Sequence, residues 1–463
     1  MKSLDLARDS AARFLESLPE RHVGAKATHA ELKKTLAVPL SEDGEPEEDV
    51  LRALIDGAEP GIVASAGPRY FGYVIGGSHP VAIAADWMTS AWDQNCGLFS
   101  TSAAASVVEE IVRDWLLDLF DLPRAAGVGL VTGCQMANFT ALAAARHAVL
   151  ESAGWDVERK GLMGAPPVTV LVSAESHVTI HRALRFLGFG LDAARRVETD
   201  GQGRMSAGAL HKALRDVEGP TIVCAQAGNV NTGSFDPLDE VLDAAHARGA
   251  WVHVDGAFGL WAAASAGRRH LLKGFERADS WATDAHKWLN VPYDCGVVIV
   301  ADPRAHAGAM SATAEYLEQS AGAELDQVNF VPEFSRRGRG FPIYAVLRHL
   351  GRRGIENLVD RCCAQARLMA SLLAADDGVE ILNDVVLNQV LVRFGKGSGA
   401  EKDETTRRVI AAVQREGTLW LSGTTWHGMA AMRVSLSNWS TTDEDVRKSA
   451  DAILVILSEG DGT

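Results

Sequence analysis

From about residue 103 onward, segments whose apolar positions follow a helical spacing alternate with short apolar runs. Several of these runs are continuous, as is typical of strands that are covered on both faces of a sheet. Such an alternation predicts a mostly parallel sheet whose strands are joined by crossover helices. The predicted strands are 129–131, 168–173, 195–198, 221–225, 251–255, 280–283 and 297–301. The predicted helices between them include 136–152, 206–217 and 238–248.

The pattern changes after Pro342, where a long helical region precedes a second group of strands. Thr441 and Glu444 have the spacing of a capping box and predict the start of a closing helix. We therefore predict an N-terminal helical arm over 1–100, a large α/β domain over 101–340 and a small α+β domain over 341–463. Residues 311–339 have no clear periodicity, which suits a lid and a solvated connector equally well. The later strands are predicted near 379–382, 388–394 and 432–436.

Composition and charge restrict the partners of the chain. Its 463 residues include 60 acidic and 45 basic side chains, a net charge of -15, which argues against nucleic acid as a partner. No apolar run reaches the roughly 18 to 20 residues that span a bilayer, and the first residues mix both charge signs instead of forming a signal peptide. The six cysteines form no CxxC pair, which predicts free thiols in a reducing cytoplasm.

Two of the predicted strands end in groups that could carry chemistry. The strand at 251–255 ends in Asp255, at the sheet edge where ligands bind in α/β folds. The strand at 280–283 leads into Asp284, His286 and Lys287. Taken alone, Asp255 could simply cap a turn and Lys287 could lie on the surface. Together they predict a pyridoxal phosphate site, since this cofactor needs a lysine for its aldehyde and an acid for its pyridine nitrogen.

The remaining parts of such a site can also be proposed from the sequence. Gly133, Cys134 and Gln135 lie at a strand-to-helix turn, where free backbone N–H groups would bind a phosphate, although many βα turns contain a glycine. His177 could cover one face of a planar ring and Ala257 the other.

His177 also has alternative roles. It stands four residues before His181, so these two histidines could instead bind a metal, or His177 could cap a helix. Because the glutamate of a zinc-protease motif is missing and no third ligand is evident, we predict no metal site.

At these residues the sequence resembles the group II pyridoxal phosphate-dependent decarboxylases of fold type I, which include aromatic amino acid, histidine and glutamate decarboxylases. The resemblance extends from about Pro68 to the C-terminus. Its most specific part is Thr-Asp-Ala-His-Lys-Trp-Leu at 283–289, followed by Tyr-Asp-Cys-Gly at 293–296. It implies an aspartate aminotransferase-like fold, with a large mostly parallel sheet domain and a smaller C-terminal α+β domain.

The resemblance also implies a role for each site residue. Lys287 would bind the cofactor aldehyde, Asp255 would pair with the pyridine nitrogen, and His177 would stack on the ring. The other cofactor contacts would come from Gly133, Cys134, Gln135, Asn229, Ala257, Asp284 and His286. Asn229 stands in a cofactor-side turn where many members carry threonine.

The substrate side is implied less directly. Residues 68–73 resemble the family segment that lines the substrate pocket, which makes Tyr73 a candidate contact, and Trp92 and Phe99 would add aromatic lining. Packing in the core or at an interface explains these side chains equally well. Family members are homodimers with active sites at the subunit interface, so the same assembly is implied here.

One departure from the family leaves the reaction outcome open. Many of these decarboxylases have a tyrosine in a mobile loop that protonates the intermediate, but the matching stretch at 325–330 contains none. Tyr316 lies upstream and could replace it. We expect decarboxylation of an L-amino acid, possibly an aromatic one, to the amine. Aldehyde synthase, carbon-carbon lyase and aminotransferase activities remain alternatives, as does a catalytically silent, dimeric binding protein.

Overall fold

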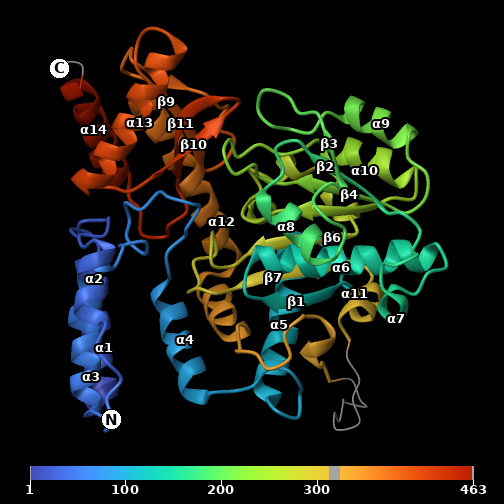
Figure 1. Cartoon of the computed structure of the whole chain (residues 1–463), viewed down its shortest axis with the longest axis horizontal. Coiled ribbons are helices and arrows are strands. Elements are labelled where there is room, and N and C mark those ends of the chain that lie inside the picture. Colours follow the sequence, from blue (N-terminus) through green and yellow to red (C-terminus); the bar gives the residue numbers. More distant parts are fainter. Residues whose placement is uncertain (1, 312–323, 461–463) are drawn as a thin grey trace. The chain divides into compact units, whose positions relative to one another are not determined.

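The computed structural model describes residues 2–311 and 324–460, and the chain divides into two compact units (Figure 1). The first unit comprises Met1–Ile75, Gln365–Leu382 and Val390–Thr463. The second comprises Gly76–Ala364 and Asn383–Gln389. The three-part division expected from the sequence stays a proposal.

A seven-stranded sheet forms the centre of the second unit, in the order β1-β7-β6-β5-β4-β2-β3. Strand β7 runs antiparallel to both of its neighbours, while the pairs from β6 to β3 are parallel. This confirms the mostly parallel sheet predicted from the apolar runs. The strands are β1 (Gly127–Val131), β2 (Thr169–Ser173), β3 (Ala194–Val197), β4 (Thr221–Gln226), β5 (Trp251–Asp255), β6 (Ser280–Asp284) and β7 (Gly296–Val300).

Every residue of strands β4 to β7 is buried, as expected for strands that are covered on both faces. Helix α6 packs against β5, β6 and β7, and α10 packs against β4 and β5. The α-helices are α4 (Pro80–Trp92), α5 (Ala103–Phe120), α6 (Cys134–Ser152), α7 (Val157–Lys160), α8 (Val178–Phe186), α9 (Ala207–Arg215), α10 (Leu238–His246) and α11 (Pro303–Met310). Short 3-10 helices lie at η2 (Gly259–Ala264), η3 (Arg269–Leu272), η4 (Phe275–Arg277) and η5 (Gln327–Asn329).

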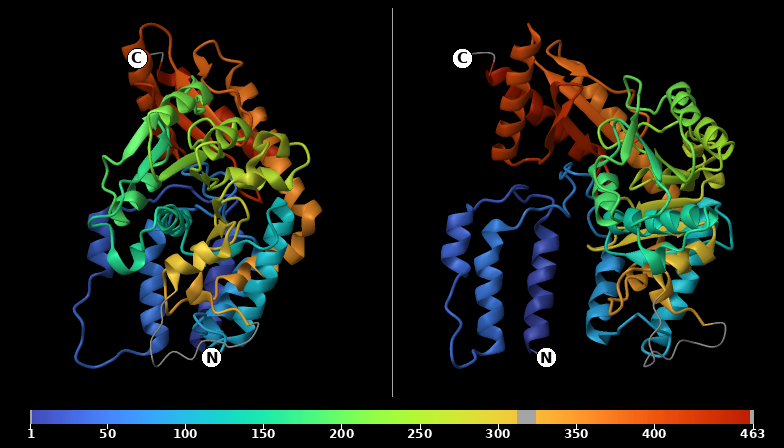
Figure 2. Two further views of the ribbon diagram at one scale, coloured as in Figure 1. Left: turned by 90° about the vertical axis from the view of Figure 1, so that its right-hand side faces the viewer. Right: turned by 45° about the vertical axis from the view of Figure 1, so that its right-hand side comes forward.

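The first unit combines N-terminal helices with a small sheet. Helices α1 (Lys2–Ser17) and α2 (His29–Leu36) both pack against α3 (Glu47–Ala58), which is followed by η1 (Glu59–Gly61) (Figure 2). The sheet has the order β10-β11-β9-β8. Its strands are β8 (Val379–Ile381), β9 (Gln389–Phe394), β10 (Ser422–Trp426) and β11 (Met429–Ser435). Helix α13 (Gly399–Glu416) packs against β11 and against α14 (Asp443–Gly460).

Helix α12 (Gly340–Leu373) belongs to both units along the chain. It is interrupted at Gly351, whose φ of 60° lies in the left-handed region that glycine adopts without a steric penalty. The long helical region predicted after Pro342 is therefore two helices joined at a glycine.

The predicted capping box at Thr441 and Glu444 is wrong by one residue. Thr442 Oγ1 accepts from the backbone N of Asp445 at 3.2 Å, and the Asp445 carboxylate accepts from the backbone N of Thr442 at 3.0 Å. Thr441 is used differently, because its hydroxyl donates to the carbonyl of Pro68 at 2.7 Å. The Thr441 hydroxyl is therefore engaged with Pro68, and Thr442 forms the cap.

Within the described ranges, none of the helices combines the length and apolar character that a bilayer crossing requires. All six cysteines are buried as free thiols.

Candidate active site

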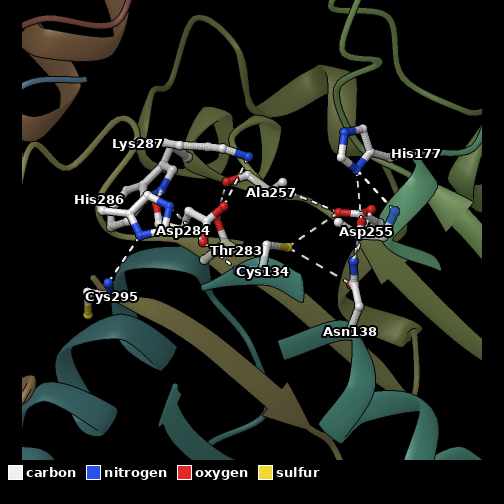
Figure 3. Close-up of polar contacts among 12 residues, drawn as sticks. Cys134, Asn138, His177, Asp255, Ala257, Thr283, Asp284, His286, Lys287 and Cys295 are labelled. Atoms are coloured by element: carbon white, nitrogen blue, oxygen red, sulfur yellow. Dashed lines mark hydrogen bonds and ion pairs between the residues drawn. The ribbon is translucent and has the colours of Figure 1, made fainter. Parts of the chain in front are cut away.

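The two strand ends singled out in the sequence are neighbours in the sheet. Strands β5 and β6 are parallel, with His253 opposite Ser280 and Asp255 opposite Ala282. Asp255 therefore ends its strand at the same edge where β6 ends in Asp284, and Lys287 follows three residues later. Figure 3 shows these side chains gathered together with Cys134 from the start of α6.

Lys287 forms an ion pair inside the protein. Its Nζ lies 3.0 Å from Asp284 Oδ2, and its side chain is 19% exposed. Burial acts to lower the pKa of Lys287, but the charge of Asp284, followed by Cys134 and Asp255, raises the pKa above its ordinary value. The free protein therefore holds Lys287 as an ammonium, which must lose a proton before it can attack an aldehyde.

Asp284 also binds the start of helix α6. Its Oδ1 accepts from the backbone N of Cys134 at 2.6 Å, and His286 Nε2 lies 3.4 Å from the same oxygen. One carboxylate thus connects the lysine to the N-terminal amide of a helix, where an anion is favoured.

The turn before α6 leaves no room for side chains. A Cβ placed on Gly133 would lie 3.0 Å from His286 Cε1. A Cβ on Gly296, which pairs with Val131 across β1 and β7, would lie 2.5 Å from the backbone of Gly133. Backbone amides, and not side chains, therefore form this part of the site.

Asp255 is buried and accepts hydrogen bonds from three donors. Its Oδ1 accepts from the backbone N of Ala257 at 3.2 Å and from Cys134 Sγ at 3.5 Å, and its Oδ2 accepts from Asn138 Nδ2 at 3.3 Å. Burial, and then the charges of Asp255 and Asp284, raise the pKa of the Cys134 thiol well above its usual range, so Cys134 keeps its proton. The bond to Ala257 closes a turn, so Asp255 caps the turn and faces the site at once.

His177 is the N-cap of helix α8. Its Nδ1 lies 2.9 Å from Thr179 Oγ1 and accepts from the backbone N of Thr179 at 3.4 Å. In Figure 3 the His177 ring and the Lys287 ammonium approach the site from different elements and from different sides. His181 Nε2 instead contacts Ser176 Oγ at 3.0 Å. The described residues contain no group of three or more His, Cys, Asp or Glu side chains placed to hold a metal.

His286 is held in a neutral state beside the lysine. Burial lowers its pKa, and its Nδ1 accepts from the backbone N of Cys295 at 3.1 Å, which leaves the proton on Nε2. The Tyr293 ring stacks on the imidazole, with centroids 4.2 Å apart. The sequence predicts no role for Tyr293, although this residue begins the segment 293–296 that resembles the family signature.

Asn229 follows the end of β4, the other neighbour of β5. Its Oδ1 accepts from the backbone N of Asn231 at 2.8 Å and of Thr232 at 3.2 Å. Its Nδ2 is buried without a hydrogen-bond partner in the described structure. A buried donor of this kind is normally satisfied, so it indicates a ligand in the complete site.

Each predicted substrate residue makes contacts of its own. Tyr73 belongs to the first unit, is 58% exposed and tilts against Trp420. Trp92 packs edge to face on Phe341, and the backbone N of Phe99 donates to an Asp326 oxygen at 2.8 Å. Gln135 turns its amide to the carbonyl of Thr179 at 3.3 Å. Tyr316 lies outside the described residues.

Residues 30–395 match the family model described as the pyridoxal-dependent decarboxylase conserved domain. The chain belongs to this family. Decarboxylases of this family are pyridoxal phosphate-dependent carboxy-lyases, so the predicted enzyme class and cofactor are confirmed.

Curated relatives agree with this family. An aromatic-L-amino-acid decarboxylase of Bacillus atrophaeus is 28% identical over 92% of this chain and 89% of its own length. An L-2,4-diaminobutyrate decarboxylase of Rhizobium meliloti (strain 1021) is 31% identical over 80% of this chain and 74% of its own.

A solved structure agrees as well. Oryza sativa TDC, crystallised with PLP and tryptamine, superposes with a TM-score of 0.93 at 25% identity, over 99% of this chain and 97% of that one. The predicted fold type I is confirmed.

The residues present suit pyridoxal phosphate. Lys287 supplies an amine, and Asp255 supplies a carboxylate that accepts from three donors. The start of α6 lies beside them, with its Cys134 amide bound to Asp284. The unpartnered Asn229 Nδ2 supplies a further donor. The lysine and both carboxylates lie at one edge of the sheet, as a single flat cofactor requires.

Proposed function

We propose that this pyridoxal phosphate-dependent amino acid decarboxylase acts on an aromatic L-amino acid and releases the corresponding amine. The observation that carries the site assignment is the Lys287–Asp284 pair at 3.0 Å beside the end of the neighbouring strand, which carries Asp255. The substrate class is supported by the relative from Bacillus atrophaeus and by a tryptophan decarboxylase of Oryza sativa that is 28% identical over 89% of this chain.

The reaction breaks the bond between the α-carbon and the carboxylate. Carbon dioxide leaves, and one proton takes its place on the α-carbon, so that an amino acid and a proton become an amine and carbon dioxide. Pyridoxal phosphate supplies an electron-accepting ring that stores the electron pair left by the departing carboxylate.

The residues of this chain then have distinct tasks. Asp284 keeps Lys287 protonated and orients its ammonium group until the lysine reacts. Asp255 would pair with the pyridine nitrogen. His177 would cover one face of the ring and Ala257 the other. Gly133, Cys134, Gln135 and His286 would lie around the phosphate.

The same chemistry allows a second outcome. The stretch 325–330 lacks a tyrosine, and η5 within it consists of Gln327–Asn329. Without a proton donor at this place, dissolved oxygen and water could react after carbon dioxide has left, and the products would be an aldehyde, ammonia and hydrogen peroxide. This candidate is favoured by that single observation.

One experiment separates these outcomes. The purified protein, loaded with pyridoxal phosphate, is incubated with a panel of aromatic, acidic and diamino acids. Carbon dioxide, amine, aldehyde and peroxide are measured together. We expect carbon dioxide and amine in equal amounts from an aromatic amino acid, and neither from the Lys287→Ala variant. Aldehyde and peroxide in place of amine would support the second candidate, and turnover of acidic substrates alone would contradict the aromatic assignment.

We also propose that the protein is a cytoplasmic homodimer whose subunits share their active sites. Helix α4 exposes large apolar side chains, with Trp87 and Met88 each 45% exposed and Trp92 48% exposed. Exposed apolar residues that gather on one helix often mark an interface. Sedimentation at micromolar concentration tests this, and a monomer there would contradict it.

A further inference from the structure

The carboxylate of Asp255 is held by a chain of neutral side chains that extends away from the cofactor. Trp251, His253 and Asp255 alternate along β5 and therefore share one face of the strand. Cys134 and Asn138 stand four residues apart on α6, which packs against that strand, and both bind Asp255. A polar face of β5 thus meets a polar face of α6 inside the core.

Each member of the chain contacts the next. Trp251 Nε1 donates to Ser280 Oγ at 2.9 Å, and Ser280 Oγ lies 3.0 Å from His253 Nδ1. His253 Nε2 lies 2.9 Å from Asn138 Oδ1, and Asn138 Nδ2 donates to Asp255 Oδ2 at 3.3 Å. Asn138, His253 and Ser280 are fully buried, so water does not compete for these bonds.

The two ends of the chain fix its direction. An indole N–H only donates, and an ionised carboxylate only accepts. If Asn138 were turned over, its carbonyl oxygen would face the carboxylate of Asp255. The arrangement that avoids this has Ser280 donating to His253 Nδ1, and His253 Nε2–H donating to Asn138. Burial lowers the pKa of His253 to about 4, so the ring is neutral and can accept on one nitrogen while it donates from the other.

Asn138 serves a second group with its other N–H. Asn138 Nδ2 also donates to Thr179 Oγ1 at 3.1 Å, and Thr179 Oγ1 lies 2.9 Å from His177 Nδ1. One amide therefore connects the carboxylate proposed for the pyridine nitrogen with the histidine proposed for the ring face.

We propose that Asn138 is a positioning residue that aims the Asp255 carboxylate at the pyridine nitrogen of the cofactor, and that His253 fixes the direction of the Asn138 amide. Ser280 and Trp251 complete the arrangement from behind. The inference rests on the proposed role of Asp255.

The test uses cofactor-free protein titrated with pyridoxal phosphate and with its analogue that has carbon in place of the ring nitrogen. Affinity is read from the visible absorbance of the lysine adduct. His253→Leu removes the donor to Asn138, whereas His253→Gln keeps an amide donor at a similar reach. We expect His253→Leu to bind pyridoxal phosphate roughly 10-fold more weakly, because it loses the hydrogen bond to Asn138 that orients the donor to the Asp255 carboxylate. His253→Gln should recover part of this loss.

The analogue distinguishes positioning from structural support. It has no ring nitrogen to meet Asp255, so His253→Leu should bind it nearly as well as the unaltered protein does. Equal losses for both cofactors, or no loss for either, would overturn the proposal. Should His253→Leu fail to fold, Ser280→Ala breaks the same chain with little change in volume, and the same preference is expected of it. An unaltered protein that forms no adduct on Lys287 would contradict the proposed function itself.

Discussion

Asp284 joins Lys287 to the first turn of helix α6, with one oxygen 3.0 Å from the lysine Nζ and the other 2.6 Å from the backbone N of Cys134. The carboxylate therefore controls the charge of the lysine and occupies a helix terminus suited to an anion. Both effects bear on how readily Lys287 reacts with the cofactor aldehyde.

Replacing Asp284 with Asn should lower the pKa of Lys287, because burial then acts without the opposing carboxylate. A shift of one unit would make about 10-fold more neutral amine available near neutral pH. The rate at which cofactor-free protein forms its visible adduct with pyridoxal phosphate should rise accordingly, and its pH profile should move to lower pH.

Asp121→Asn is the matched control, since it neutralises a carboxylate that pairs with Arg269 on the surface. It should leave the profile where it is. A profile of Asp284→Asn that stays in place or moves to higher pH would show that Asp284 does not set the charge of Lys287.

Lys287→Ala should abolish the covalent adduct with pyridoxal phosphate that borohydride traps. The lysine is the amine at this edge of the sheet, and its removal leaves the surrounding backbone contacts of Asp284 in place. Mass spectrometry of the reduced protein checks this by the loss of the cofactor mass. An adduct of equal yield on another lysine would contradict the assignment.

The pH dependence of stability should change when the buried His306 is replaced with Leu. Burial lowers the pKa of His306 to about 4, below its ordinary value of 6.5, so the folded protein holds it neutral while the unfolded chain takes up a proton. Its contribution to stability is therefore present above pH 6.5 and is lost as the pH falls from about 6.5 towards 4. Thermal melting should show the unaltered protein losing stability relative to the His306→Leu variant as the pH falls over that range. A difference in melting temperature that does not change with pH would refute this.

Replacing one partner of the buried Arg336–Glu109 ion pair should lower the free energy of unfolding more than replacing both partners. Arg336 Nη1 lies 2.9 Å from Glu109 Oε1, and Arg336 Nη2 donates to the carbonyl of Leu130 at 2.7 Å. Arg336→Met should cost about 3 to 5 kcal/mol in the free energy of unfolding, because Glu109 stays buried without a partner. The double variant with Glu109→Leu should recover much of that cost in urea denaturation. Additive losses would argue against the coupling.

Much of the framework could be predicted from the sequence because it depends on local pattern. The alternation of helical segments with short strand-like runs, several of them continuously apolar, located all seven strands of the large sheet. Asp255 ends one of these strands, and Lys287 lies just beyond the end of another. The predicted capping box was wrong because the Thr441 hydroxyl donates to the carbonyl of Pro68, which lies 373 residues away in the chain. Local spacing has no information on such a contact.

The network behind Asp255 was missed for a related reason. Asn138 lies four residues after Cys134, and His253 lies two residues before Asp255, so both spacings were visible in the sequence. The sequence does not show that α6 packs Asn138 against that face of β5. There the Asn138 amide contacts His253 through its oxygen and donates to Asp255 and Thr179 through its nitrogen. Packing between elements distant in sequence creates this arrangement.

The close approach of Gly296 to Gly133 also limits how the enzyme can be altered. Strand β7 carries no group proposed to react, yet a single methyl at position 296 would collide with the backbone that leads into α6. Substitutions should therefore be poorly tolerated at Gly296 on β7 as well as at the reactive side chains. Engineering of new substrate preferences is best directed to other walls of the site.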